Sequence, residues 1–304
     1  MTSLPLVFAP DVLEAQANGA PVVALESTII THGMPYPQNL ETAQRVEAEV
    51  RAAGATPATI AVMGGKLHIG LCAEELEALA RAKGVMKLSR ADLAACLATG
   101  RSGATTVAAT MIAAHLAGIS VFATGGIGGV HRGAELSFDI SADLQELAQT
   151  PVTVVAAGAK AILDLPKTLE VLETLGVPVI AFGQDEFPAF WSKHSGLLAP
   201  LRMDSAGEIA SAHLMRAQLG LAGGQLVANP IPDADEIAPA TINPVIETAL
   251  AEAAARGIAA KSVTPFLLAR IFDLTGGRSL EANIALVLNN ARLGAAIATR
   301  IAQR

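Results

Sequence analysis

The sequence predicts a three-layer α/β/α fold, a member of the α/β class, with a mostly parallel central sheet. Five short apolar runs are candidate strands: residues 21–25, 59–63, 119–123, 151–156 and 177–182. Continuous apolar runs are typical of parallel strands buried on both faces, and here amphipathic segments separate them, as in βαβ units. Past Asp204 the pattern becomes mainly helical. We therefore expect a helical C-terminal third that belongs to one single domain, residues 1–304.

The composition agrees with a compact globular protein. Of the 304 residues, 52% are hydrophobic and only 16% are charged, which suits helices layered on a sheet and hints at buried subunit contacts. The net charge of −7 and the lack of a basic run argue against nucleic acid or a membrane surface as a partner. Cys72 and Cys96 fit neither a disulfide framework nor a zinc site. Because residues 1–16 lack a basic region before an apolar core, we expect no signal peptide and a cytoplasmic protein.

Residues 102–130 contain no Asp, Glu, Lys or Arg, a length that can span a bilayer. Their alanine, glycine and threonine content and the presence of His115 favour another interpretation. We expect a buried helix followed by a strand, with the change near Gly118.

A glycine-rich turn follows the candidate strand at 119–123. Within TGGIGGVHRG, which begins at Thr124, four of five consecutive residues are glycine. Such a turn lets backbone N–H groups converge on an anion, and His131 and Arg132 add charge, so a phosphate site is predicted. The turn matches neither the Rossmann fingerprint nor the P-loop. The alternative is a tight turn whose glycines serve only backbone geometry.

Lys160 and Glu26 each follow a candidate strand. Lys160 is predicted to lie in the first turn of a helix, where the helix dipole disfavours an ammonium and favours a nucleophilic amine. The alternative is a solvated surface lysine. Glu26 falls at the carboxyl end of the run 21–25, where ligands of α/β sheets gather, although a carboxylate there can also be a helix cap.

Asp139 and Asp143 lie four residues apart, with Ser141 between them. Mg²⁺ and Mn²⁺ bind one or two carboxylates and keep several waters, so the pair is a candidate metal site. The alternative is a helix start, with Ser141 or Asp139 capping a helix that runs to Gln149.

Taken together, these motifs resemble the pseudouridine-5′-phosphate glycosidase family, which includes indigoidine synthase A-like proteins. The resemblance covers nearly the whole chain, in order. The matching segments are residues 24–37, 87–90, 124–132, 138–143, 158–160, 185–190 and 283–292.

The resemblance implies an enzyme, a manganese-dependent homotrimer that cleaves pseudouridine 5′-phosphate to uracil and ribose 5-phosphate. It implies that Lys160 is the nucleophile and Glu26 the proton donor. It also implies that Asp139 holds Mn²⁺, with Asp143 as the other candidate. The implied substrate contacts are Lys87, Val107, Ser141, Ala142 and Asp143, with Thr124 and His131 at the phosphate and Asn283 orienting Glu26 or the sugar.

The implied chemistry suits a carbon–carbon bond. Ordinary glycosidases expel an oxygen leaving group with two carboxylates, but a C-glycoside has no such atom. A lysine amine that opens the sugar and forms an imine can instead push off the uracil carbon. Two alternatives stay open: a class I aldolase-like lyase that uses Lys160 on another sugar phosphate, and a regulatory protein that only binds one.

Overall fold

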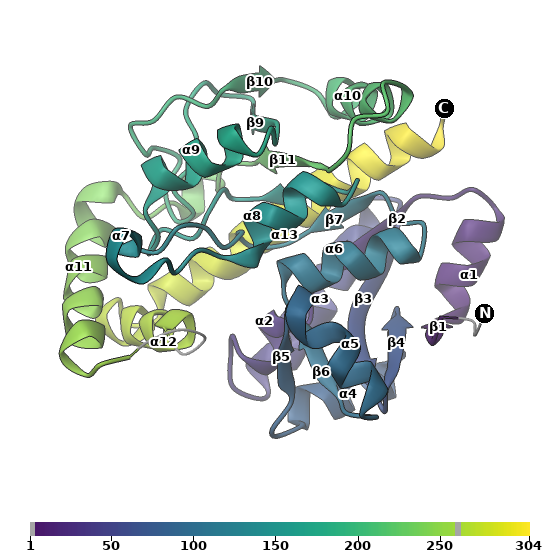
Figure 1. The fold of residues 1–304 in the computed structure, drawn as a ribbon, viewed down its shortest axis with the longest axis horizontal. Helices are drawn as coiled ribbons and strands as arrows, with labels where there is room; N and C mark the ends of the chain where they lie inside the picture. The colour runs from purple at the N-terminus through teal and green to yellow at the C-terminus, as the bar shows by residue number, and fades with distance from the viewer. Residues whose placement is uncertain (1–3, 259–262) are drawn as a thin grey trace.

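The computed structural model describes residues 4–258 and 263–304, which form helices around one sheet of eleven strands (Figure 1). The strands are β1 (Leu6–Phe8), β2 (Val22–Leu25), β3 (Thr56–Met63), β4 (Lys66–Ile69), β5 (Met86–Leu88), β6 (Gly103–Thr105), β7 (Val121–Ala123), β8 (Thr153–Ala156), β9 (Val179–Phe182), β10 (Leu201–Met203) and β11 (Gln225–Ala228).

Thirteen α-helices and one 3₁₀ turn are described around the sheet. They are α1 (Pro10–Ala17), α2 (Thr28–Thr31), α3 (Gln38–Ala52), α4 (Ala73–Arg81), α5 (Arg90–Ala98), α6 (Val107–Leu116), α7 (Ala134–Ser137), α8 (Ala142–Gln149), α9 (Leu165–Thr174), α10 (Ala206–Gln218), η1 (Asp233–Asp235), α11 (Pro239–Ala255), α12 (Val263–Leu274) and α13 (Arg278–Ala302).

The sheet is mostly parallel, as predicted. Its main path runs β1-β4-β3-β2-β7-β8-β11-β9-β10, and β5 and β6 extend from β3. Strand β3 pairs antiparallel with β4 and β6, while the other paired strands run parallel. The four residues of β2, of β8 and of β11 are all buried, because helices cover both faces of the sheet.

Helices form a layer on each face, which confirms the α/β/α prediction (Figure 1). Helix α13 packs on β2, β7 and β8 and contacts α3 and α10. Helix α6 packs on β2, β3 and β7 and contacts α8. The 102–130 segment belongs to this unit, since it forms β6, α6 and β7 and is largely buried. Within the described ranges, no helix combines the length and apolar character needed to cross a membrane.

The C-terminal third is mainly helical, as predicted, but the sequence interpretation missed β11. This strand lies between β8 and β9 in the sheet. Its four residues follow Gly223 and Gly224, and Asn229 and Pro230 come directly after it. A run this short carries little periodic signal, and the glycines before it and the proline after it do not mark it as a strand.

The sheet has a switch point between β2 and β7. The chain leaves β2 through α3 to reach β3 on one side, and α6 brings it back to β7 on the other. Ala24 pairs with Phe122 and Leu25 with Ala123, so the next residues, Glu26 and Thr124, follow two adjacent strand ends. Open α/β sheets bind ligands in the crevice outside such a point.

Candidate active site

A cavity of about 380 Å³ opens at this switch point. Residues that follow β2, β7 and β8 line it, together with residues from β5, α12 and α13. Nearly all of the predicted site residues line this one cavity: Glu26, Lys87, Val107, His131, Asp139, Ser141, Ala142, Asp143, Lys160 and Asn283. Thr124 is the exception.

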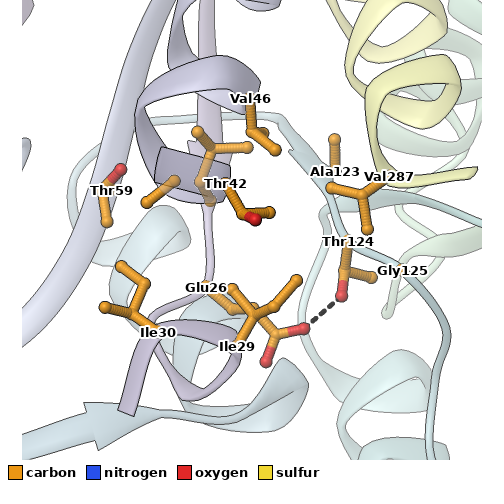
Figure 2. A pocket seen from close by; sticks show the side chains of 12 residues that line it. Glu26, Ile29, Ile30, Thr42, Val46, Thr59, Ala123, Thr124, Gly125 and Val287 are labelled. Atoms are coloured by element: carbon orange, nitrogen blue, oxygen red, sulfur yellow. Dashed lines mark hydrogen bonds between the residues drawn. The ribbon is translucent and has the colours of Figure 1, made fainter. Parts of the chain in front are cut away.

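Two threonine hydroxyls hold the Glu26 carboxylate. Thr28, the first residue of α2, donates to Oε2, and Thr124 donates to Oε1 from the adjacent strand end. Figure 2 shows the second bond together with other side chains that line a separate, smaller pocket, including Thr42 and Val46. Thr124 is only 2% exposed and lines this smaller pocket, not the 380 Å³ cavity. This placement favours a role in holding Glu26 over the expected contact with phosphate.

The glycine turn positions Lys160. Its Nζ donates to the carbonyl oxygen of Gly126 at 2.6 Å. The backbone N–H of Ile127 donates to Gly158, and that of Lys160 donates back to Ile127. Lys160 lies in the loop before α9, so the prediction that it sits in the first turn of a helix is wrong. Its amine is therefore oriented by a backbone carbonyl and not by a helix dipole.

The glycines of the turn permit close packing. A Cβ on Gly128 would lie 2.2 Å from Ser141 Oγ, and one on Gly129 would lie 2.5 Å from Thr168 Oγ1. The N–H of Gly128 donates to Asp143 Oδ2 at 2.8 Å. At Gly128, the N–H of the turn thus bonds to the protein's own carboxylate, and the predicted phosphate site at this turn stays a prediction.

The two aspartates differ in their surroundings. Asp143 is 6% exposed, and its second oxygen, Oδ1, accepts from the N–H of Ala108 at 2.9 Å. Both of its oxygens are thereby used, which argues against the prediction that Asp143 binds a metal. Asp139 lines the cavity and is half-buried. Ser141 caps α8 by accepting from the N–H of Asp143, so the helix start that was the alternative interpretation is also present.

The donor set around Asp139 is small. Over residues 4–258 and 263–304, no group of three or more His, Cys, Asp or Glu side chains is arranged to hold a metal. A single carboxylate in an open cavity still suits Mg²⁺ or Mn²⁺, which commonly take one or two carboxylates and complete their coordination with water and substrate phosphate. The residues present fit such an ion through Asp139.

Two histidines line the cavity in an electropositive setting. Burial lowers the pKa of His131; Asp139 opposes this change, whereas Lys160 and Lys87 reinforce it. Burial also lowers the pKa of His32, and the charge of Lys87 adds to the effect. Both imidazoles are therefore neutral at pH 7, and Lys87 supplies positive charge beside them.

Helix starts add to the polarity of the cavity. Val107 begins α6 and Ala142 begins α8, and both line the cavity. The N-terminus of a helix carries partial positive charge and unpaired N–H groups. These residues can therefore meet a ligand through the backbone, which explains why two apolar side chains occur among the predicted contacts.

Asn283 comes from α13 and lines the cavity. Its Oδ1 accepts from Trp191 Nε1 at 2.8 Å, and the same N–H contacts the carbonyl of Ser279 at 3.1 Å. Asn283 makes no hydrogen bond to Glu26, whose two oxygens accept from threonines, so of its two expected roles the contact with the sugar stays a prediction.

Several lining residues were not singled out from the sequence. They are His32, Ser89, Thr106, Phe190, Thr264, Pro265 and Leu268, among others. His32 lies within the matching segment 24–37, so the family resemblance was an available signal. Thr264, Pro265 and Leu268 come from α12, and nothing in their local sequence indicates a ligand.

Comparison with known proteins decides the family. Residues 11–300 match the sequence model described as "Indigoidine synthase A like protein". The chain belongs to the indigoidine synthase A-like family. A relative from Jannaschia sp. (strain CCS1), named pseudouridine-5′-phosphate glycosidase, is 75% identical over 296 residues, covering 97% of this chain and 98% of the relative. A Paracoccus denitrificans protein of the same name is 74% identical over 299 residues, covering 98% of each.

Two solved structures of this type share the fold. The prealnumycin C-glycosynthase AlnA, solved in complex with ribulose 5-phosphate, superposes with a TM-score of 0.91 at 39% identity, covering 100% of this chain and 98% of AlnA. An indigoidine synthase A-like protein from Thermotoga maritima gives a TM-score of 0.90 at 34% identity, covering 99% of this chain and 98% of that one. The fold of this family member is thus shared over its whole length.

Proposed function

We propose that this protein is a pseudouridine-5′-phosphate glycosidase, which reversibly cleaves the carbon–carbon glycosidic bond of pseudouridine 5′-phosphate to uracil and ribose 5-phosphate. The observation that carries the proposal is the identity of 75% and 74%, over nearly the full length, to proteins of that name. The gathering of Glu26 and Lys160 in one cavity supports it. AlnA, with a pentulose phosphate in the same fold, supports a sugar phosphate as ligand.

Glu26 and Lys160 carry the reaction in this proposal. Glu26 donates a proton to the ring oxygen of the ribose while the Lys160 amine attacks C1′, so the C1′–O bond breaks and the sugar opens. The attack leaves a protonated secondary amine, which returns a proton to the Glu26 carboxylate; its lone pair then forms a C=N bond as the C1′–C5 bond to uracil breaks. The uracil carbon takes up that proton from Glu26, and water hydrolyses the Lys160 iminium to release ribose 5-phosphate and restore the proton of Glu26.

The rest of the cavity orients the substrate. Lys87 and neutral His131 contribute charge and a hydrogen bond toward the phosphate end, and Ser141 and the amides at the starts of α6 and α8 add donors. Lys87 also favours the anionic form of nearby groups through its charge. Trp191 fixes Asn283, whose amide is available to the sugar or the base.

We also propose that Mn²⁺ binds through Asp139, with water and substrate oxygens as its other ligands. When bound, the ion supplies positive charge to an anionic sugar phosphate and helps to orient it. Asp139 is the candidate because it lines the cavity, whereas the oxygens of Asp143 are already bonded.

The assembly proposed is a cytoplasmic homotrimer of single-domain subunits. One sheet takes strands from residue 6 to residue 228, which supports a single domain. Leu136 and Phe138 are 89% and 83% exposed, and such apolar surface supports subunit contacts. Light scattering after size exclusion tests the trimer, which requires three times the 31.0 kDa chain mass; a monomer mass would refute it.

Borohydride trapping tests the proposed reaction. The protein is incubated with ribose 5-phosphate, uracil and Mn²⁺, and one sample is reduced for mass spectrometry while another is assayed for pseudouridine 5′-phosphate. We expect a reduced pentose-phosphate adduct on Lys160 together with the nucleotide. An adduct without the nucleotide would favour the aldolase-like lyase, and the absence of both would favour a binding protein. A Lys160→Ala variant with full activity would refute the role of the amine.

A further inference from the structure

Asp143 is a buried carboxylate that the reaction proposed above does not use. Its two oxygens accept hydrogen bonds from the backbone N–H groups of Ala108, at 2.9 Å, and Gly128, at 2.8 Å. Ala108 is the second residue of α6, Gly128 lies in the glycine turn, and Asp143 itself lies in the first turn of α8. One side chain thus joins three segments that line the cavity.

These bonds complete a pairing between the glycine turn and the segment before α8. The N–H of Ser141 donates to the carbonyl of Gly129, and the N–H of His131 donates to that of Asp139. Charged acceptors make stronger bonds to N–H groups than neutral ones do. The contact from Asp143 to Gly128 is therefore the strongest link in this pairing, and it lies at the end nearest Lys160.

The position of Gly128 affects the position of Lys160 through the neighbouring residues of the turn. Gly128 follows Ile127, whose N–H and C=O both bond to the 158–160 segment. Gly126 precedes Ile127, and its carbonyl accepts from Lys160 Nζ. A shift of Gly128 away from Asp143 would displace the carbonyl that orients the amine. Small displacements of this kind are costly in catalysis, because attack requires close alignment of the reacting atoms.

We propose that Asp143 is a positioning residue, a built-in anion that fixes the glycine turn against α6 and α8 and so keeps the Lys160 amine in place. This role of Asp143 rests on the proposed function, because it explains how the proposed nucleophile, Lys160, is held in place. Asp143 occupies the N–H groups of Ala108 and Gly128, which an external phosphate would otherwise attract, and leaves those of Val107 and Ala142 for a ligand. The substrate phosphate is therefore bound by other groups of the cavity.

Hydrogen exchange tests the positioning directly and needs no substrate. Asp143→Asn is compared with Asp139→Asn, a matched change four residues earlier. An asparagine presents one acceptor and one NH₂ group to two N–H donors, so one donor loses its partner. We expect exchange of the Ala108 or Gly128 amide to accelerate about tenfold or more in Asp143→Asn only. Unchanged exchange at both amides would overturn the proposal.

Two further measurements on the same variants separate positioning from metal binding. We expect Asp143→Asn to lower the rate at which the imine forms at Lys160, measured by trapping, by about 10- to 100-fold. Its affinity for Mn²⁺, measured by electron paramagnetic resonance, should stay within about threefold of wild type. Asp139→Asn should weaken Mn²⁺ binding by about tenfold or more. If Asp143→Asn loses Mn²⁺ as strongly as Asp139→Asn does, Asp143 is a ligand and the inference fails.

A second variant disturbs the contact between Asp143 and the glycine turn by changing the turn. In Gly128→Ala the new Cβ would lie 2.8 Å from Asp143 Oδ2 and closer still to Ser141 Oγ, so it should reproduce the slow imine formation of Asp143→Asn. Normal imine formation in either folded variant, checked by thermal unfolding, would overturn the proposal. Wild-type protein that forms no nucleotide would refute the proposed function instead, and the exchange result would still decide the role of Asp143.

Discussion

Replacing Arg90 with methionine should weaken the link between α5 and α8. Arg90 Nε and Nη2 donate to the two oxygens of Glu146 at 2.7 and 2.8 Å, and Thr150 also donates to this carboxylate. Glu146 is 1% exposed. Helix α5 follows the Lys87 segment, and α8 begins beside Ser141, so the ion pair joins two walls of the cavity.

The expected cost lies between two limits. Removing one partner of a fully buried ion pair costs about 3–5 kcal/mol, whereas exposed pairs are worth about 0–1 kcal/mol. The Arg90 side chain is 53% exposed while that of Glu146 is buried, so an intermediate value of about 2.5 kcal/mol is expected. For 304 residues the unfolding entropy is roughly 0.6 kcal/mol/K, which converts this to a fall in Tm of about 4 °C.

Thermal unfolding checks this value against a matched surface pair. Arg202 makes comparable contacts with Asp185 and Asp204, but all three side chains are exposed. Arg202→Met should therefore lower Tm by no more than about 1–2 °C. Arg90→Met should also raise KM, because Lys87 and Ser141 lose their fixed separation. If Arg90→Met changes Tm no more than Arg202→Met does, the ion pair does not contribute as argued.

Three other predictions concern the site and its surroundings. Thr124→Val should lower kcat about tenfold through loss of one bond to Glu26, and Thr124→Ser should largely retain it; equal losses in steady-state assays would indicate a packing effect. Burial lowers the pKa of His213 from 6.5, so the unfolded chain binds a proton at a higher pH than the folded protein does. The free energy of unfolding should therefore fall as the pH drops through about 6.5. In urea titrations, His213→Gln should show a smaller fall. Trp191 is the sole tryptophan and bonds to Asn283, so ribose 5-phosphate should change its fluorescence, and an unchanged spectrum at saturation would place the ligand away from Asn283.

The fold was largely predictable because its central strands are continuous apolar runs. Residues 21–25 and 119–123 are strands by composition alone, and they became β2 and β7. Strands β1, β4, β5, β6, β10 and β11 were missed. Each has only three or four residues and lies outside the five apolar runs, and pairing across the sheet, which no local pattern reveals, stabilises it.

The sequence predicted which residues line the site better than it predicted how those residues are held and what they contact. The resemblance brought Glu26, Lys87 and Lys160 together, and they do line one cavity. The local physical argument for Lys160 failed, because the loop before α9 is longer than its sequence suggests. The use of Thr124 and Asp143 as internal partners depends on contacts between segments distant in the chain, which spacing alone does not encode.

The position of α13 in the chain has a consequence for synthesis. This helix follows all the strands of the sheet in sequence, yet it packs on β2, β7 and β8 and carries Asn283 and Val287 into the cavity. Chains grow and begin to fold from the N-terminus. Glu26 and Lys160 therefore emerge from the ribosome well before the wall that encloses them, and a nascent chain cannot form a complete catalytic cavity until α13 has been translated.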